Sequence, residues 1–357
     1  MLRKIRAVVI DDSAFMRKSL SIMLEGSGEI EVIGTARDGL EGYNLVKSTK
    51  PDIVTLDIEM PKMDGLTALQ KIMKDCPTPV MMVSSLTTEG AESTLKAMEY
   101  GAVDFIPKEL SFVNVNIIKI KDDLIRKVKE IVKQRSLTDR LQRLRNLSGK
   151  SKTRTGVIEP DSKPLPKIGY KAIALGISTG GPMSLQKVVP AIKKEITVPI
   201  FIVQHMPPKF TKSLAERLNG ISNVEVKEAE HNDVVKAGSV YIAPGGFHMT
   251  LKKISSGQIL IDISENPSTT LHRPSVDIMM SSVLNVYGKS TLGVIMTGMG
   301  KDGYEAVKEL KNIGGYTIAQ DEDSCVVYGM PKAIVDAGYA DVILPLEKIA
   351  DQINKVV

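Results

Sequence analysis

Ala7-Val8-Val9-Ile10, followed at once by Asp11-Asp12, is the stretch that decides the fold of the first part of the chain. It is an apolar run of strand length, and further runs of this kind follow, separated by stretches whose apolar residues have helical spacing. These further runs are residues 30–35, 53–56, 80–83 and 102–106. Strands that alternate with helices favour a parallel sheet covered by helices on both faces.

A second alternating series begins at Lys171 and predicts a second α/β domain. Its apolar runs are residues 172–177, 199–203, 240–243 and 292–296, and the residues around Gly257-Gln258 predict an antiparallel hairpin or edge element. An amphipathic helical stretch lies between the two series and continues into a basic segment rich in Ser, Gly and Pro. We therefore predict two domains, residues 1–125 and 166–357, joined by a helical, basic linker over 126–165.

Length and composition exclude several classes of protein. The 357 residues are too many for one ordinary core, and the 43% hydrophobic and 25% charged residues are typical of a globular chain. Cys76 and Cys325 have no partner at metal-ligand spacing, which favours a reducing compartment. Because we find no signal-peptide pattern and no apolar stretch near the ~20 residues that span a bilayer, we expect a cytoplasmic protein without membrane insertion.

The net charge of +5 is concentrated in one segment. Residues 133–167 contain ten Lys or Arg and three Asp or Glu, so the remainder of the chain is slightly acidic. Aromatic residues make up only 4% of the chain and tryptophan is absent, whereas many proteins that bind nucleic acid carry an aromatic stacking surface. We therefore expect no nucleic-acid partner and interpret the basic segment as a solvated linker.

Carboxylates follow two of the predicted strands of the first domain. Asp11 and Asp12 come directly after the first strand, and Asp57 ends the third. Since the carboxyl ends of parallel strands line one edge of the sheet, these side chains should gather there and repel one another unless a cation lies among them. Oxygen ligands with room for water favour Mg²⁺. The alternative for any single aspartate is a turn residue or a helix N-cap.

The same edge should also carry a hydroxyl and an ammonium group. Ser84 ends the next strand, and Lys108 follows the last one. Both groups suit a phosphoryl group placed on one of the carboxylates, because the lysine and a metal ion would neutralise its oxygens. Ser85 is the competing candidate for the hydroxyl.

In the second domain, a strand runs directly into Gly176-Ile177-Ser178-Thr179-Gly180-Gly181, and Pro182 then opens a helix. Gly-x-Ser-x-Gly is typical of a nucleophile elbow, in which small neighbours let the chain turn sharply and present the serine hydroxyl. The helix would supply N–H donors and a partial positive charge for an oxyanion. A structural turn and a glycine-rich anion loop are the alternatives, although no Lys-Ser/Thr completes a P-loop.

His205 is the candidate base for this serine, because it ends the strand 199–204 at the same sheet edge. Of the other three histidines, His231 lies in a polar, acidic stretch typical of a surface, whereas His248 and His272 are candidates for lining a pocket.

Asp302 is the candidate acid, since it follows the strand 292–296 inside a glycine-rich turn, with a helix N-cap as the alternative role. The order Ser…His…Asp differs from that of the α/β-hydrolases, chymotrypsin and subtilisin, but a triad is defined by geometry.

The first domain resembles a response-regulator receiver domain over roughly residues 4–125. The resemblance rests on Asp11-Asp12, on Asp57 with Met60-Pro61-Lys62-Met63-Asp64-Gly65, and on Ser84 and Lys108, in that order. It implies a flavodoxin-like, five-stranded parallel sheet. It further implies that Asp57 is the phosphoacceptor, that Asp11, Asp12 and Asp57 hold Mg²⁺, and that Ser84 and Lys108 form the phosphorylation switch. Many receivers have a tyrosine where this chain has Phe105, so a switch that uses a tyrosine hydroxyl would lack it here.

The second domain resembles the catalytic domain of the chemotaxis protein-glutamate methylesterases, the CheB family, whose receiver–linker–esterase order covers the full chain. The motifs that carry the resemblance are 176–181, 204–207, 273–277 and 297–303. They imply a doubly wound α/β domain with a mostly parallel sheet, the catalytic residues Ser178, His205 and Asp302, and no cofactor in this domain. Less directly, they imply oxyanion donors near Thr179 and Met299, and a substrate cleft shaped by Arg273, Pro274 and Ser275.

The resemblance also implies a function. The expected enzyme hydrolyses glutamate γ-methyl esters and deamidates particular glutamines on chemoreceptors through an acyl-enzyme, and phosphorylation of its receiver regulates it in chemotaxis adaptation. Methyl-accepting chemoreceptors would be the substrate and a chemotaxis histidine kinase the phosphodonor.

Two other classes of protein remain as alternatives. A transcriptional response regulator would need a recognition-helix module after the linker, where the chain has a βα series instead. A receiver fused to a nucleotide-binding adaptor would use the backbone of residues 176–181 for phosphates, and would not need the hydroxyl of Ser178.

Overall fold

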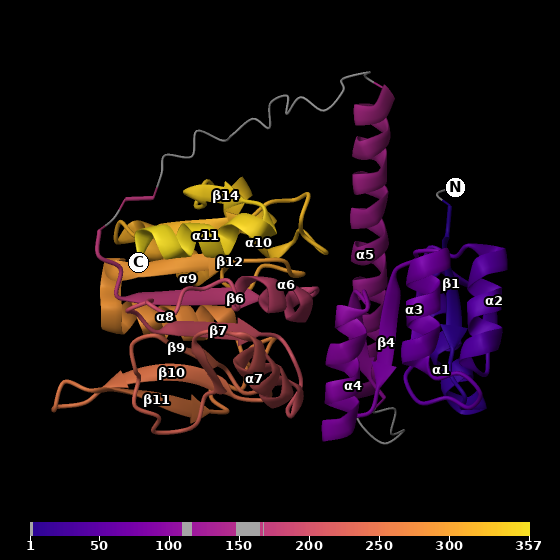
Figure 1. Cartoon of the computed structure of the whole chain (residues 1–357), viewed down its shortest axis with the longest axis horizontal. Helices are drawn as coiled ribbons and strands as arrows, with labels where there is room; N and C mark the ends of the chain where they lie inside the picture. The colour runs from indigo at the N-terminus through magenta and orange to yellow at the C-terminus, as the bar shows by residue number, and fades with distance from the viewer. Residues whose placement is uncertain (1–2, 109–115, 148–164, 167) are drawn as a thin grey trace. The chain divides into compact units, whose positions relative to one another are not determined.

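The computed structural model describes residues 3–108, 116–147, 165–166 and 168–357, and they form two compact units, Met1–Arg140 and Leu141–Val357 (Figure 1). Part of the predicted linker, residues 148–164, lies outside the described residues. None of the described helices combines the length and apolarity that crossing a bilayer requires.

The first unit contains the predicted five-stranded parallel sheet, with strand order β2-β1-β3-β4-β5. The strands are β1 (Ile5–Ile10), β2 (Ile30–Ala36), β3 (Ile53–Asp57), β4 (Val80–Ser84) and β5 (Asp104–Pro107). The helices are α1 (Ala14–Glu25), α2 (Gly39–Thr49), α3 (Gly65–Asp75), α4 (Thr88–Glu99) and α5 (Asn116–Leu147), which begins in the first unit and extends past its last residue, Arg140. The strands β3 and β4 are buried along their whole length, which explains why the sequence shows continuous apolar runs instead of alternation.

Helix α5 runs through residue 125, where the sequence placed the boundary of the first domain. Leu124, Val128 and Ile131 are buried at helical spacing, so the beginning of the predicted linker packs on the first unit. Lys127 holds the helix to β5, because its Nζ lies 3.1 Å from Asp104 Oδ2 and donates to the Phe105 carbonyl at 3.1 Å.

The second unit contains a seven-stranded parallel sheet with strand order β14-β13-β12-β6-β7-β9-β8, and a separate antiparallel hairpin, β10-β11. The predicted strands appear as β6 (Ala172–Ile177), β7 (Ile200–Gln204), β9 (Ser239–Ile242), β10 (His248–Lys253), β11 (Ile259–Ser264) and β12 (Thr291–Ile295). The α/β fold class with a mostly parallel second sheet is thereby confirmed. Three further strands were not predicted from the sequence: β8 (Glu225–Glu228), β13 (Tyr316–Gln320) and β14 (Val342–Leu344).

The helices of the second unit connect these strands. They are α6 (Gly181–Val188), α7 (Phe210–Ile221), α8 (Val276–Tyr287), α9 (Tyr304–Asn312), α10 (Met330–Asp336) and α11 (Leu346–Val356). The chain leaves β6 toward β7 and β9 and later returns to β12 on the other side of β6, so the strand order reverses between β6 and β12. In doubly wound sheets, the carboxyl ends of the strands at such a reversal border the crevice in which ligands bind. The loops after β6 and β12 carry Ser178 and Asp302.

Candidate functional site

The carboxyl edge of the first sheet gathers the three predicted carboxylates. Asp11 and Asp57 are buried and Asp12 is exposed, and each offers a ligand oxygen within 4.8 Å of the others. The Lys108 ammonium reaches the same place, 2.6 Å from Asp57 Oδ2 and 3.8 Å from Asp11 Oδ2. The predicted lysine and aspartates therefore lie together at one site.

The electrostatics of this cluster of carboxylates fit a divalent cation. Burial, and then the charge of Asp57, raise the pKa of Asp11 to about 6, and Asp11 Oδ2 is buried without a hydrogen-bond partner. Burial also raises the pKa of Asp57, although Lys108 opposes this shift. One lysine does not neutralise the clustered carboxylates, whereas Mg²⁺ bound by their oxygens and by water would.

Neither Asp11 nor Asp12 caps the helix that follows them. The N-cap of α1 is Ser13, whose hydroxyl accepts from the Met16 N–H. Gly65, at the start of α3, lies directly against the strand end that carries Asp57. A Cβ at Gly65 would come within 1.9 Å of the Asp57 carbonyl oxygen, so only glycine fits this approach.

The two candidate switch hydroxyls have different contacts. Ser84 is buried at the end of β4, and its Oγ donates to the Gly90 carbonyl at 3.1 Å. Ser85 Oγ lies 3.2 Å from Thr87 Oγ1. The assignment of Ser84 as the switch hydroxyl stays a prediction.

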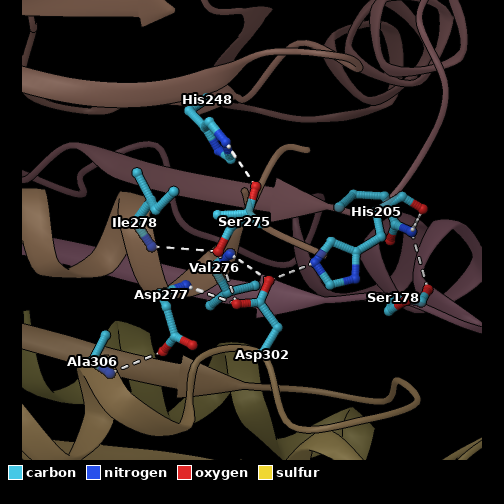
Figure 2. Close-up of polar contacts among 11 residues, drawn as sticks. Ser178, His205, His248, Ser275, Val276, Asp277, Ile278, Asp302 and Ala306 are labelled. Carbon is cyan, nitrogen blue, oxygen red and sulfur yellow. Dashed lines mark hydrogen bonds and ion pairs between the residues drawn. The ribbon is translucent and has the colours of Figure 1, made fainter. Parts of the chain in front are cut away.

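In the second unit, Ser178, His205 and Asp302 come together from the loops that follow β6, β7 and β12 (Figure 2). His205 Nε2 lies 2.8 Å from Asp302 Oδ2, and both side chains are about nine-tenths buried, with 9% and 10% of their surface exposed. The other ring nitrogen, Nδ1, is buried without a hydrogen-bond partner and is turned toward Ser178 (Figure 2). A serine hydroxyl that approaches the ring would thus meet the one nitrogen that is available to accept its proton.

Asp302 is held by the N-terminus of α8, not by its own helix. Its Oδ2 accepts from the Val276 N–H at 2.7 Å, and its Oδ1 accepts from the Asp277 N–H at 3.1 Å and from Ser275 Oγ at 2.9 Å. Burial alone would raise the pKa of Asp302, but His205 and these N–H groups hold it well below its usual range. The carboxylate therefore stays charged beside the imidazole.

Asp277 completes a reciprocal arrangement of two helix N-termini (Figure 2). Its Oδ1 accepts from the Ala306 N–H, near the start of α9, at 2.9 Å. Each carboxylate thus supplements the N-terminus of the other's helix: Asp302, just before α9, accepts from N–H groups of the first turn of α8, and Asp277, in α8, accepts from an N–H group of the first turn of α9. Burial and the charge of Asp302 raise the pKa of Asp277 to about 6. The alternative that Asp302 caps the helix that follows it is not observed, since the N-cap of α9 is Gly303.

A buried amide ties the serine and histidine backbones together. Gln204 Nε2 donates to the carbonyls of both Ser178, at 3.0 Å, and His205, at 3.2 Å. The amide oxygen lies so close to Gly181 that a Cβ there would be 1.8 Å from it. Gly181 and Gln204 thus pack against each other under the turn that presents Ser178.

We expect Gly181→Ala to displace the Gln204 amide and to lower the free energy of unfolding by about 1–3 kcal/mol, the usual cost of overpacking. Because Gln204 contacts the backbones of both Ser178 and His205, activity should fall as well. Thermal unfolding and ester hydrolysis measure the two effects. Gly220→Ala is the matched control, since a Cβ at this helical glycine would meet nothing within 4 Å. Equal stability of the two variants would contradict the prediction.

The candidate oxyanion donors lie beside the serine. Thr179 and Met299 are both buried, and within the described residues neither of their backbone N–H groups donates a hydrogen bond. Gly298 brings the loop after β12 close to Ser178, because a Cβ at Gly298 would lie 2.8 Å from Ser178 Cβ. Two unused N–H groups beside a serine are the arrangement that an oxyanion hole needs.

The predicted cleft residues Arg273, Pro274 and Ser275 lie just before α8. Arg273 is partly exposed and pairs with Glu265 at 3.4 Å, and Pro274 is buried. Ser275 is the N-cap of α8 and donates to Asp302, so the structure gives it a contact with the candidate acid. A direct contact of these residues with substrate stays a prediction.

The other histidines have distinct surroundings. His231 is exposed and pairs with Asp262 at 3.2 Å, whereas His248 is fully buried, with its pKa lowered mainly by burial. His272 stacks on the ring of His205, with centroids 4.2 Å apart. His272 was a candidate for lining a pocket, but its contact with His205 was not predicted, because nothing in the spacing of residues 205 and 272 indicates it.

Comparison with known proteins identifies both units. The chain matches the family model for the response regulator receiver domain over residues 7–117 and the model for the CheB methylesterase over residues 173–353. A curated relative from Pyrococcus horikoshii, named protein-glutamate methylesterase/protein-glutamine glutaminase, is 45% identical over 358 residues, which cover 100% of this chain and 95% of the relative. A relative from Nitratidesulfovibrio vulgaris, named protein-glutamate methylesterase/protein-glutamine glutaminase 2, is 48% identical, and the match covers 97% of both chains.

Among solved structures, the catalytic domain of the Thermotoga maritima CheB methylesterase is 44% identical, with a TM-score of 0.51. The match covers 53% of this chain and 100% of that domain. Fold and site together define a response regulator whose output domain is a hydrolase. The chain belongs to the CheB methylesterase family, and the predicted class of enzyme, a protein-glutamate methylesterase/protein-glutamine glutaminase with a receiver domain, is confirmed.

Proposed function

We propose that the second unit demethylates glutamate γ-methyl esters, and deamidates particular glutamines, on chemoreceptors by a Ser-His-Asp acyl-enzyme mechanism. The observation that carries this proposal is the placement of the His205 ring, with Nε2 on Asp302 and Nδ1 turned toward Ser178. Methanol release from methylated chemoreceptor membranes tests the esterase activity, and ammonia release from receptors with glutamine at the same sites tests the glutaminase activity.

In the first half of the reaction, Ser178 Oγ attacks the γ-carbonyl carbon while His205 Nδ1 takes the hydroxyl proton. Asp302 remains charged, because its N–H donors and His205 stabilise the carboxylate, and it stabilises the imidazolium that forms. The negative oxygen of the tetrahedral intermediate accepts from the N–H groups of Thr179 and Met299.

The intermediate then collapses to a glutamyl-serine ester. The bond to the leaving group breaks, His205 returns its proton, and methanol leaves from an ester or ammonia from an amide. A water molecule attacks the acyl carbon with His205 again as base, and Ser178 recovers its proton as the glutamate carboxylate departs. Both activities therefore use one site and one set of residues.

Phosphorylation of the first unit regulates this activity. Asp57 is the phosphoacceptor, Asp11, Asp12 and Asp57 hold Mg²⁺, and Lys108 pairs with the phosphoryl oxygens. The bound Mg²⁺ supplies positive charge that offsets the repulsion between the carboxylates and the phosphoryl group. The clustered carboxylate oxygens and the 2.6 Å contact of Lys108 with Asp57 support these roles. A Ser84 hydroxyl that turns from Gly90 to the phosphoryl group would complete the switch.

We expect Asp57→Asn to abolish the response of the full chain to a small phosphoryl donor, because an amide oxygen is too weak a nucleophile to be phosphorylated. The measurement is the ratio of methanol release with and without the donor. Omission of Mg²⁺ should remove the response of the wild-type chain in the same way. An excised second unit, whose Thermotoga maritima counterpart was solved alone, should not respond at all. A donor response that survives Asp57→Asn would place the phosphoacceptor elsewhere.

The implied partners follow from these chemistries. Methyl-accepting chemoreceptors supply the glutamyl esters, a chemotaxis histidine kinase supplies the phosphoryl group, and neither nucleic acid nor membrane insertion has a part in the reaction. The proposed location is the cytoplasm, where the receptors' methylated helices and the kinase would both be accessible.

A further inference from the structure

The rings of His272 and His205 lie flat against each other. Their centroids are 4.2 Å apart and their planes differ by 16°, which is a close, nearly parallel stack. His272 is partly buried and belongs to the segment of residues 267–277, which leads into α8. Its partner in the stack is the proposed base of the reaction, so the contact bears on how the base is aimed.

A hydrogen bond to Asp302 does not by itself fix the plane of the His205 ring. The torsion about Cβ–Cγ of histidine has a broad energy profile, and rotation about this bond moves Nε2 only a short way. The Asp302 contact thus tolerates some tilt of the ring. The same tilt turns the Nδ1 lone pair away from the serine, and Nδ1 has no hydrogen bond of its own to resist it. A flat partner against one face supplies the missing restraint.

The 267–277 segment is anchored at both ends. Near its start, His248 Nε2 lies 3.2 Å from both the Pro267 carbonyl oxygen and Thr270 Oγ1. The Gly246 N–H donates to the Arg273 carbonyl at 3.1 Å. At its end, Ser275 Oγ and the Asp277 N–H donate to Asp302. One segment therefore contacts the base through His272 and the acid through the N-terminus of α8, and it sets their positions relative to each other.

We propose that His272 is a positioning residue for the reaction: its ring stacks on His205 and holds the imidazole plane so that Nδ1 stays directed at Ser178. His272 acts through His205 and does not contact the reacting atoms. The inference rests on the proposed role of His205 as the base.

The test compares the full-length variants His272→Ala and His272→Phe under phosphorylating conditions. We expect His272→Ala to lower kcat for methanol release by about 10- to 100-fold, since a stack is lost and the base is misaligned, with KM nearly unchanged. His272→Phe keeps a flat ring and should retain kcat within about 3-fold. Inactivation by a fluorophosphonate, in which the Ser178 oxygen displaces fluoride, should slow in His272→Ala by a similar factor.

Rates are expressed per mole of Ser178 that ultimately reacts with the fluorophosphonate, so that misfolded protein does not count. His231→Ala, which removes an exposed histidine paired with Asp262, is the control and should behave as wild type. Three results would overturn the inference. The first is a wild-type kcat in His272→Ala, and the second is a rise in KM alone in that variant, which would indicate a contact with substrate. The third is an equal loss of activity in His272→Phe and His272→Ala. His205→Ala separates the two proposals, because its retention of activity would refute the proposed mechanism itself.

Discussion

Ser178→Ala is expected to lower methanol release from methylated chemoreceptors by on the order of 10⁴-fold or more, because the reaction loses its nucleophile. Deamidation should fall with it, since both activities proceed through the same acyl-enzyme. The binding of receptor should remain, so the defect should appear in kcat and not in KM.

Ser178→Ala should remove the nucleophile without disturbing the fold. The hydrogen bonds of Ser178 within the described residues all use its backbone: its N–H donates to the Thr297 carbonyl, and its carbonyl accepts from Gly181 and Gln204. Alanine keeps each of them, so the unfolding temperature should stay close to that of the wild type. Ser256→Ala, in the exposed turn between β10 and β11, is the matched control for loss of a serine hydroxyl.

The same variant separates the enzyme from the nucleotide-binding adaptor. An adaptor that uses the N–H groups of residues 176–181 for phosphates would be indifferent to the Ser178 hydroxyl, and so would a purely structural turn. Methanol release at the wild-type rate by Ser178→Ala would thus disprove the triad. Collapse of release, with the fold intact, would establish both the esterase and its nucleophile.

Sequence patterns located the candidate functional residues that follow directly on a parallel strand. Asp57 ends β3, and Ser178 and His205 follow β6 and β7 directly, so period and polarity alone indicated which edge of each sheet they share. Because the carboxyl ends of parallel strands lie at the same edge of a sheet, the strand pattern alone predicts that residues at these ends are close together. This is why the cluster of aspartates in the first unit and the shared sheet edge of Ser178 and His205 could be predicted from the sequence.

The supporting contacts could not be predicted in this way. Asp277 capping α9, Gln204 tying two loops together and His272 stacking on His205 each depend on how loops distant in sequence pack. Each of these residues has an ordinary interpretation in the sequence, as a helix N-terminal acid, a strand-end amide or a loop histidine. The missed strands have a similar explanation.

Of those strands, β8 is a charged four-residue edge strand and β14 has only three residues. Neither is long enough to show a period, so both are defined by pairing with a neighbour that sequence patterns do not reveal.

Asp302→Asn is expected to lower activity by about 10⁴-fold, as loss of the orienting carboxylate does in serine hydrolases, and also to destabilise the second unit. Each carboxylate oxygen of Asp302 accepts from a backbone N–H, Oδ2 from Val276 and Oδ1 from Asp277. An amide group has only one oxygen, so in either orientation its NH₂ faces an N–H donor that it cannot satisfy, at a cost of about 1–3 kcal/mol. Asparagine is also neutral, so it does not stabilise the imidazolium that His205 becomes during the reaction. Because its side-chain amide can either donate or accept a hydrogen bond, it does not fix the tautomer of the His205 ring.

The loss of activity and the loss of stability caused by Asp302→Asn can be measured separately, because only the loss of activity depends on the contact with His205. Ser275→Ala removes a donor to Asp302 but leaves its charge, its N–H donors and the His205 contact in place. It should lower stability by about 1 kcal/mol with a much smaller loss of activity. Thermal unfolding and methanol release on the two variants therefore distinguish support of the α8 terminus from orientation of the base. If Asp302→Asn lost stability but kept activity within about 10-fold of wild type, Asp302 would be a reciprocal helix cap and not a member of a catalytic triad.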